Sequence, residues 1–189
     1  MQYIVVPATS KTMGPSRAVP CLVLLFLLSS SSGASVVLED TCKSIAAGKE
    51  RSIGYNYCIK FFEASKGSAT ADKRGLAVIA SKLNRRAAAK SMVKRIHALR
   101  ASEKDKVIQM GLDICGQLYS TAVDELDAAA KGVEAGTPEV KFDAEMYLTG
   151  AFDAPETCET GFGEMGLKSP PDAEFTKEVY IAMAVTHSL

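Results

Sequence analysis

Apolar side chains recur every three to four residues along most of the chain after residue 70, a period typical of amphipathic helices. Alanine is common, proline is sparse, and few segments alternate as strands do. We therefore predict an all-α fold, an antiparallel up-and-down four-helix bundle whose core is built from four apolar stripes. The stripes consist of Leu76, Ile79, Leu83, Ala87, Val93, Ile96 and Leu99; Val107, Gly111, Ile114, Leu118, Ala122 and Leu126; Phe142, Met146, Thr149 and Phe152; and Phe175, Val179, Ala182, Met183 and Thr186.

Local signals mark where these helices begin and end. Ser102–Asp105 and Ser169–Asp172 resemble capping boxes, with aspartate in place of the usual glutamate or glutamine. Thr137–Glu139 places a cap residue before a proline in the first helical position. Gly132 and Gly136 are suited to ending the preceding helix. The predicted helices are thus joined by short connections.

Two shorter helical patterns precede the bundle, over residues 37–47 and 55–64. We interpret them as an N-terminal helical hairpin at 35–66, followed by the bundle at 67–189. Together these 155 residues have the length of one domain and can bury a substantial core.

Residues 1–34 have the pattern of a signal peptide. Lys11 and Arg17 precede an apolar run over residues 18–28, and small residues follow it up to Ala34, where cleavage is expected. The run is much shorter than the ~20 residues that a spanning helix needs, so we predict no membrane anchor. The mature protein is expected to be secreted to the extracellular space or cell wall, with the vacuole as a less favoured destination. Cys21 leaves with the signal peptide.

The remaining cysteines are Cys42, Cys58, Cys115 and Cys158, an even number without a CxxC motif, which indicates two disulfides rather than a metal site. If the turn between the second and third bundle helices is centred near residue 135, Cys115 precedes it by 20 residues and Cys158 follows it by 23. These spans correspond to about 30 and 34 Å of helix, so antiparallel packing brings the two cysteines level. We predict Cys115–Cys158 and, by elimination, Cys42–Cys58.

Charge restricts the choice of partners. Residues 35–189 carry 20 basic and 22 acidic side chains, a net charge of −2, which argues against nucleic acid as a partner. The charges are nevertheless segregated, with nine basic residues from Lys82 to Lys106 and eleven acidic residues from Asp124 to Glu164. We interpret the two blocks as solvated helix faces in preference to an electrostatic steering device.

The inventory of reactive side chains argues against an enzyme. The only histidines are His97 and His187, and neither belongs to a GxSxG or HExxH motif. We predict no catalytic residues, no metal site and no cofactor. A small secreted hydrolase, a polypeptide hormone and a carrier or structural bundle are the competing classes; a secreted carrier or structural bundle without inhibitory activity is the alternative we retain.

Several segments of the mature chain are similar to the plant invertase and pectin methylesterase inhibitor family. The matching segments are Asp40–Ala46 (DTCKSIA), Tyr55–Cys58 (YNYC), Gly75–Ala80 (GLAVIA), Cys115–Tyr119 (CGQLY) and Thr149–Phe162 (TGAFDAPETCETGF). The resemblance implies a four-helix bundle with an N-terminal helical hairpin and two disulfides. It also implies an inhibitor that binds and blocks a plant carbohydrate-active enzyme and does not itself transform substrate.

The resemblance leaves two target enzymes open. Pectin methylesterase inhibitors tend to carry SAALT before the fourth cysteine, where this chain has Thr149–Asp153. Invertase inhibitors tend to carry Pro-Lys-Phe before the third bundle helix, whereas here two residues separate Pro138 from Lys141 and Phe142. Taken as a whole, the amino-acid sequence is most similar to family members named as invertase inhibitors. We take pectin methylesterase first, as the general family activity, and acid invertase as the other target.

The two targets imply different contacts in a one-to-one complex. With acid invertase, the turn carrying Pro138, Lys141 and Phe142 would enter the sugar-binding cleft, where Lys141 pairs with carboxylates and Phe142 occupies a sugar subsite. With pectin methylesterase, polar faces of the second and third bundle helices would cover the polysaccharide cleft. A core contact at the start of the helix is the other interpretation of Phe142, and the one that the sequence favours.

Overall fold

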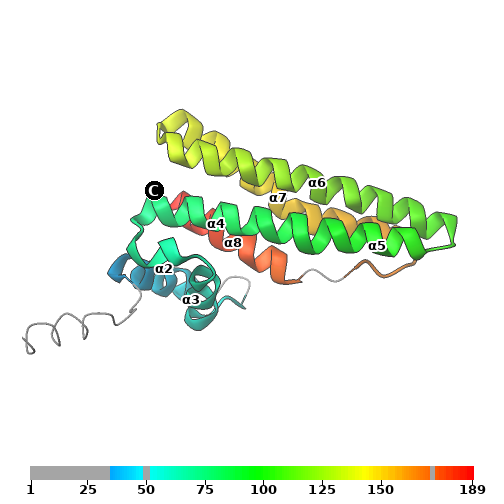
Figure 1. Ribbon diagram of the computed structural model, residues 1–189, viewed down its shortest axis with the longest axis horizontal. Coiled ribbons are helices and arrows are strands. Elements are labelled where there is room, and N and C mark those ends of the chain that lie inside the picture. The colour runs from blue at the N-terminus through cyan, green and yellow to red at the C-terminus, as the bar shows by residue number, and fades with distance from the viewer. Residues whose placement is uncertain (1–34, 49–51, 171–172) are drawn as a thin grey trace, which may run out of the picture. The chain divides into compact units, whose positions relative to one another are not determined.

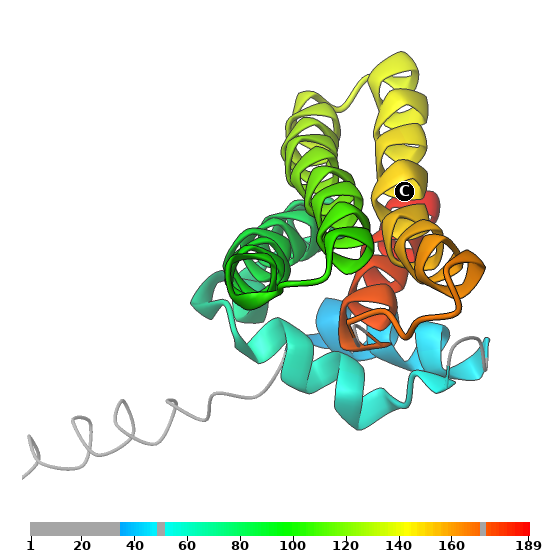
Figure 2. The same ribbon diagram turned by 90° about the vertical axis from the view of Figure 1, so that its right-hand side faces the viewer.

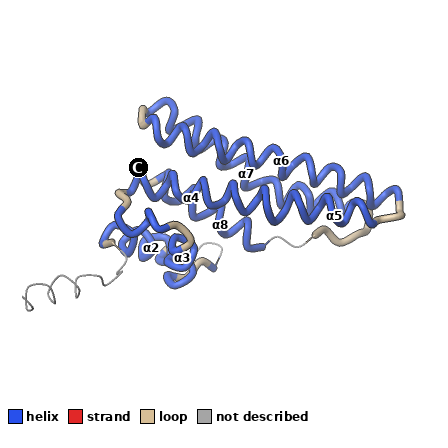
Figure 3. Tube along the Cα trace, viewed as in Figure 1, coloured by secondary structure: helices blue, strands red, loops and turns tan. Residues whose placement is uncertain are grey.

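The computed structural model describes residues 35–48, 52–170 and 173–189, so the predicted signal peptide lies outside the described ranges. All regular structure within these ranges is helical (Figure 3). The prediction of an all-α fold is confirmed. In chain order the elements are α2 (Val36–Ala47), α3 (Tyr55–Glu63), the 3-10 helix η2 (Lys66–Thr70), α4 (Lys73–Ala87), the π-helical segment η3 (Ala88–Val93), α5 (Lys94–Ser102), α6 (Lys106–Ala135), α7 (Pro138–Glu164) and α8 (Ala173–His187).

Four long helical segments form the bundle. Figure 1 shows α4, η3 and α5 as one continuous rod, with α6, α7 and α8 beside it. Figure 2, seen along the bundle, shows these segments around a common centre, with α2 and α3 on one side. Large apolar side chains fill that centre, and the largest that are fully buried include Phe62, Leu76, Ile96, Tyr119, Leu126, Leu148, Val179 and Ile181.

Both predicted disulfides are present. Cys115 of α6 is bonded to Cys158 of α7, with Cα atoms 5.0 Å apart, and Cys42 of α2 is bonded to Cys58 of α3, with Cα atoms 5.5 Å apart. The first bond confirms the antiparallel register that was inferred by counting residues from the turn. The second joins the two helices of the N-terminal hairpin.

The fourth predicted stripe lies in the core, and the third is misplaced. The first and second lie there only in part, since Leu99 of the first stripe is 40% exposed. In α6 the buried face includes Leu112, Cys115 and Tyr119, whereas Val107 and Ile114 are about half exposed. The predicted α6 stripe therefore coincides with the core face at Gly111, Ala122 and Leu126 and departs from it at Val107 and Ile114. A broad apolar surface on a helix does not by itself fix which part of that surface is buried.

The third stripe is wrong because the buried face of α7 runs through other positions. Its buried positions are Ala144, Leu148, Ala151, Ala154, Pro155, Cys158 and Phe162, whereas Phe142 and Met146 are exposed. The alternation of four- and three-residue steps that includes Cys158 is the sequence signal that would have located this face. The small residues among them, Ala144, Ala151 and Ala154, allow α7 to pack closely on α6.

The predicted start of α6 also needs correction. Ser102 is the last residue of α5 and does not cap α6; its hydroxyl instead donates to carbonyls of its own helix. The cap is Asp105, whose carboxylate accepts hydrogen bonds from the backbone N–H groups of Val107 and Ile108 at 2.7 and 3.3 Å. The acidic residue of the supposed box is therefore the N-cap itself. The other predicted box, at 169–172, ends in residues outside the described ranges.

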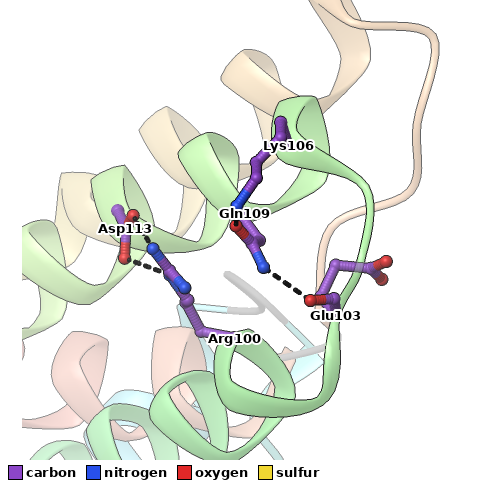
Figure 4. A network of polar contacts seen from close by, with 5 residues as sticks. All are labelled: Arg100, Glu103, Lys106, Gln109 and Asp113. Carbon is purple, nitrogen blue, oxygen red and sulfur yellow. Dashed lines mark hydrogen bonds and ion pairs between the residues drawn. The ribbon is translucent and has the colours of Figure 1, made fainter.

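Side chains at the α5–α6 corner hold the two helices together (Figure 4). Arg100 donates two hydrogen bonds to the carboxylate of Asp113, at 2.9 and 3.2 Å. Gln109 donates to the backbone carbonyl of Glu103, and Lys106 donates to the side-chain oxygen of Gln109. A bidentate arginine–carboxylate pair constrains the angle between two helices more strongly than a single contact does.

The two glycines near the α6–α7 turn have different roles. Gly136 ends α6 with a positive φ of 75°, as predicted for a helix C-terminus. Gly132 was predicted to end the helix as well, but it lies inside α6. A Cβ at Gly132 would lie 2.9 Å from the carbonyl oxygen of Val140, so the missing side chain allows α6 and α7 to approach closely beside the turn.

Side chains of α3 and α8 connect the hairpin to the bundle. We call the group formed by Tyr57, Glu174, Lys177 and Glu178 the joint. The hydroxyl of Tyr57 on α3 donates to the carboxylate of Glu174 on α8 at 2.7 Å, and Lys177 lies 5.7 Å from the centre of the Tyr57 ring. A pocket of about 470 Å³ lies between α3, α4, η3 and α8, and Glu178 is part of its wall. Burial, and secondly the charge of Glu174, raise the pKa of Glu178 to about 7.

Within the described residues, no helix combines the length and the apolar character that crossing a membrane requires.

Removing either disulfide should destabilise the fold, and the larger loop should matter more. The chain-entropy estimate gives a loss of about 4 kcal/mol in the free energy of unfolding for the pair Cys115→Ala and Cys158→Ala, and about 3 kcal/mol for Cys42→Ala and Cys58→Ala. Urea denaturation of the two double variants measures the losses. A variant without Cys115 and Cys158 that unfolds at the wild-type urea concentration would show that the α6–α7 register does not depend on the bond.

The joint should make stability depend on pH. Because the folded-state pKa of Glu178 is raised to about 7, folding favours its protonated form. The resulting stabilisation is complete below the ordinary carboxyl pKa and is lost as the pH rises through about 7. Urea denaturation at pH 5 and pH 8 should therefore show a decline in stability that Glu178→Gln reduces. Glu63→Gln removes an exposed carboxylate and serves as the control; an equal effect of both variants would exclude Glu178 as the source.

Candidate protein-binding site

The turn between α6 and α7 lies at the end of the bundle where α8 also ends (Figure 1). Gly136 closes α6, Thr137 is the N-cap residue of α7, and Pro138 occupies the first turn of α7, as the sequence predicts. Hydrogen bonds from its own backbone N–H and from Thr137 lower the pKa of Glu139. These local features start α7 sharply and leave its first residues at the surface.

The predicted site residues Pro138, Lys141 and Phe142 lie together on this first part of α7, but their surroundings differ. Pro138 is exposed, and Phe142 is 63% exposed, so Phe142 is not a core contact at the helix start. The interpretation that the sequence favoured for Phe142 is therefore wrong. The side chain of Lys141 is only 33% exposed, because it lies against the neighbouring helix α8.

Phe142 belongs to a small apolar surface on α7. Met146 follows it by one helical turn and is 59% exposed. Tyr147 is 43% exposed but lies five residues after Phe142, and therefore on a different side of the helix. Exposed large apolar side chains that lie one turn apart are typical of protein-binding surfaces. The helical pattern placed Phe142 and Met146 in the core, and only Phe142 was also a predicted contact with a target enzyme.

Lys141 contacts the end of α8. Its ammonium group lies 3.3 Å from the backbone carbonyl oxygen of His187 and 4.0 Å from the carboxylate of Glu145. The ring of His187 lies 3.4 Å from the same carboxylate. Sequence reasoning treated His187 as an ordinary histidine and did not connect it with Lys141, which precedes it by 46 residues.

A second surface lies along the outer side of α6 and α7. A groove of about 310 Å³ is lined by Ile114, Leu118 and Glu125 from α6 and by Gly150 and Asp153 from α7, among others. The carboxylate of Glu125 fills the space that a side chain on Gly150 would need. Burial, and secondly the charge of Asp153, raise the pKa of Glu125.

Ion pairs account for much of the charge segregation. Lys82 and Arg85 of α4 pair with Glu134 and Asp127 of α6, at 2.8 and 3.2 Å, and Arg100 of α5 pairs with Asp113 at 2.9 Å. Three of the nine residues in the basic block therefore pair with acidic residues of α6. By contrast, Asp153, Glu156 and Glu159 of α7 have no ion pair within the described part of the chain, so the outer side of α7 stays acidic.

Within the described residues, no group of three or more histidine, cysteine, aspartate or glutamate side chains is arranged to hold a metal ion. His97 lies exposed on α5, and His187 lies at the end of α8. The two histidines are thus placed on different helices.

Comparison with known proteins agrees with this arrangement. Residues 36–185 match the model of the family described as plant invertase/pectin methylesterase inhibitor. The chain is 32% identical over 173 residues to a protein of Platanus acerifolia named "Putative invertase inhibitor", covering 88% of this chain and 92% of that protein. It is 28% identical over 145 residues to the Arabidopsis thaliana "Cell wall / vacuolar inhibitor of fructosidase 2", covering 76% of this chain and 75% of that protein.

The fold also resembles a solved structure. A crystal structure of a pectin methylesterase inhibitor from Arabidopsis thaliana superposes with a TM-score of 0.54 at 17% identity, covering 79% of this chain and 93% of that one. At this identity the likeness concerns the fold alone. The family model and the relatives are named as inhibitors and not as enzymes. From the match over residues 36–185, the chain belongs to the plant invertase/pectin methylesterase inhibitor family.

Proposed function

We propose that residues 1–34 are a cleaved signal peptide and that the mature protein is a secreted inhibitor. It binds one molecule of a cell-wall carbohydrate-active enzyme and excludes that enzyme's substrate. The observation that carries this proposal is the exposed Phe142 on the turn at the end of the bundle. The complex needs neither catalytic residues nor a cofactor from this chain.

Acid invertase is the target that this observation favours. An aromatic side chain that projects from a narrow helical turn has the shape to enter a concave sugar-binding cleft, where aromatic anchors often supply much of the binding energy. In this proposal Pro138, Lys141 and Phe142 form the target-binding turn, with Phe142 as the anchor. The names of the relatives from Platanus acerifolia and Arabidopsis thaliana support the same target.

Pectin methylesterase is the second candidate, and a different surface supports it. The groove between α6 and α7 places the carboxylates of Glu125 and Asp153 beside the apolar side chains of Ile114 and Leu118. These residues lie on the second and third bundle helices, from which the family resemblance implies the contacts with this enzyme. In that complex the turn would lie at the edge of the interface.

Titration against both enzymes tests the proposed function. The purified mature protein should hydrolyse neither sucrose nor pectin, and it should inhibit an acid invertase with an end point of one inhibitor per enzyme molecule. A parallel titration against a pectin methylesterase, across acidic to neutral pH, separates the two targets. Inhibition of neither enzyme would favour a carrier or structural bundle.

Phe142→Ala tests the contact surface. If Phe142 is an anchor, its removal should weaken inhibition by roughly 30-fold or more, the loss expected for a hot spot of at least ~2 kcal/mol. Because Phe142 is 63% exposed, the melting temperature should stay close to the wild-type value. Met110→Ala is the matched control, since Met110 is 55% exposed near the start of α6. Inhibition that survives Phe142→Ala but is lost in Asp153→Asn would assign binding to the groove instead.

A further inference from the structure

Two lysines hold the C-terminal end of α8. Lys141 Nζ lies 3.3 Å from the carbonyl oxygen of His187, and Lys73 Nζ lies 3.1 Å from that of Ser188. The last carbonyls of a helix lack intrahelical partners and form the negative end of the helix dipole. An ammonium group at this place accordingly satisfies a carbonyl oxygen and compensates the dipole. Lys73 brings the start of α4 to this point, and Lys141 brings the start of α7.

Glu145 of α7 lies close to both Lys141 and His187. One of its carboxylate oxygens lies 4.0 Å from Lys141 Nζ and 3.4 Å from Nδ1 of His187. Lys141 therefore contacts α8 directly, through the backbone carbonyl of His187. The carboxylate of Glu145 lies near both the Lys141 ammonium group and the His187 ring. The ammonium group is directed to α8, whereas the next side chain along α7, Phe142, is exposed to solvent.

We propose that Lys141 is a positioning residue of the target-binding turn. Its ammonium group ties the first part of α7 to the end of α8 and thereby fixes the direction in which Phe142 projects. Phe142 makes the contact with the target, and Lys141 acts through Phe142. This inference rests on the proposed function, in which the turn binds an enzyme.

The size of the loss of affinity in Lys141→Ala distinguishes a positioning role of Lys141 from a direct contact with the target. Loss of an exposed cation at a helix C-terminus corresponds to a change of roughly two- to five-fold in an equilibrium constant. Loss of one partner of a charge pair in a desolvated cleft corresponds to roughly 30-fold or more. A positioning role therefore predicts a small loss of affinity for Lys141→Ala beside a large one for Phe142→Ala.

Amide hydrogen exchange of the free protein tests the structural part without any target. Lys141→Ala should speed exchange at residues 141–145 and at 184–188, because the tie between α7 and α8 is gone. Lys141→Arg retains a cation and should restore the wild-type rates. Lys131→Ala is the matched control: it removes a cation from the α6 side of the same turn, where Lys131 pairs with Asp127 and not with α8. Unchanged exchange in Lys141→Ala would overturn the proposal.

Inhibition constants of the same variants, measured against the enzyme that the wild type inhibits, test the functional part. Lys141→Ala should weaken inhibition two- to five-fold, and Lys141→Arg should leave it near the wild-type value. A loss of about 30-fold or more in Lys141→Ala would assign Lys141 a direct contact, and faster exchange without any loss of affinity would show that the tie does not serve binding; either result overturns the proposal. If no enzyme is inhibited, the proposed function fails by itself, while the exchange rates still decide whether Lys141 holds the turn.

Discussion

The close approach of α6 and α7 is the constraint on which the rest of the structure depends. Cys115 and Cys158 join the two helices at one level, with Cα atoms 5.0 Å apart, and Gly132 allows them to approach each other beside the turn. Because the register is fixed at both places, the turn must lie at the end of the bundle. The first residues of α7 then lie beside the last residues of α8, where Lys141 can reach His187.

The same close packing decides which side chains face outward. Ala144 and Ala151 occupy the buried face of α7, and two larger side chains, Phe142 and Met146, are left on the outside. Exposing large apolar side chains costs solvation free energy in the free protein. A bound partner that covers them recovers that cost, so the packing of small residues in the core and the apolar surface of the turn are two consequences of one arrangement.

The outer surfaces of the bundle differ in charge and in apolar character. Lys82, Arg85 and Arg100 of α4 and α5 pair with carboxylates of α6, whereas the outer side of α7 stays acidic. The turn presents an aromatic side chain, whereas the groove between α6 and α7 presents Glu125 and Asp153 beside apolar residues. The two surfaces therefore differ in their chemistry. The joint at Tyr57 and Glu178 lies elsewhere, between the hairpin and α8.

The sequence by itself determined the helical fold class and both disulfides. Helical periodicity and capping signals are local, and the pairing of Cys115 with Cys158 follows from counting residues on either side of one turn. Only the tertiary structure decided how α6 and α7 are rotated about their own axes. A helix with apolar residues on several sides has no unique buried face until its neighbours are present, and so Phe142 and Met146 were assigned to the core. The contact of Lys141 with His187 could not be predicted from the sequence either. It joins two helices through a backbone carbonyl group, and every residue type carries one.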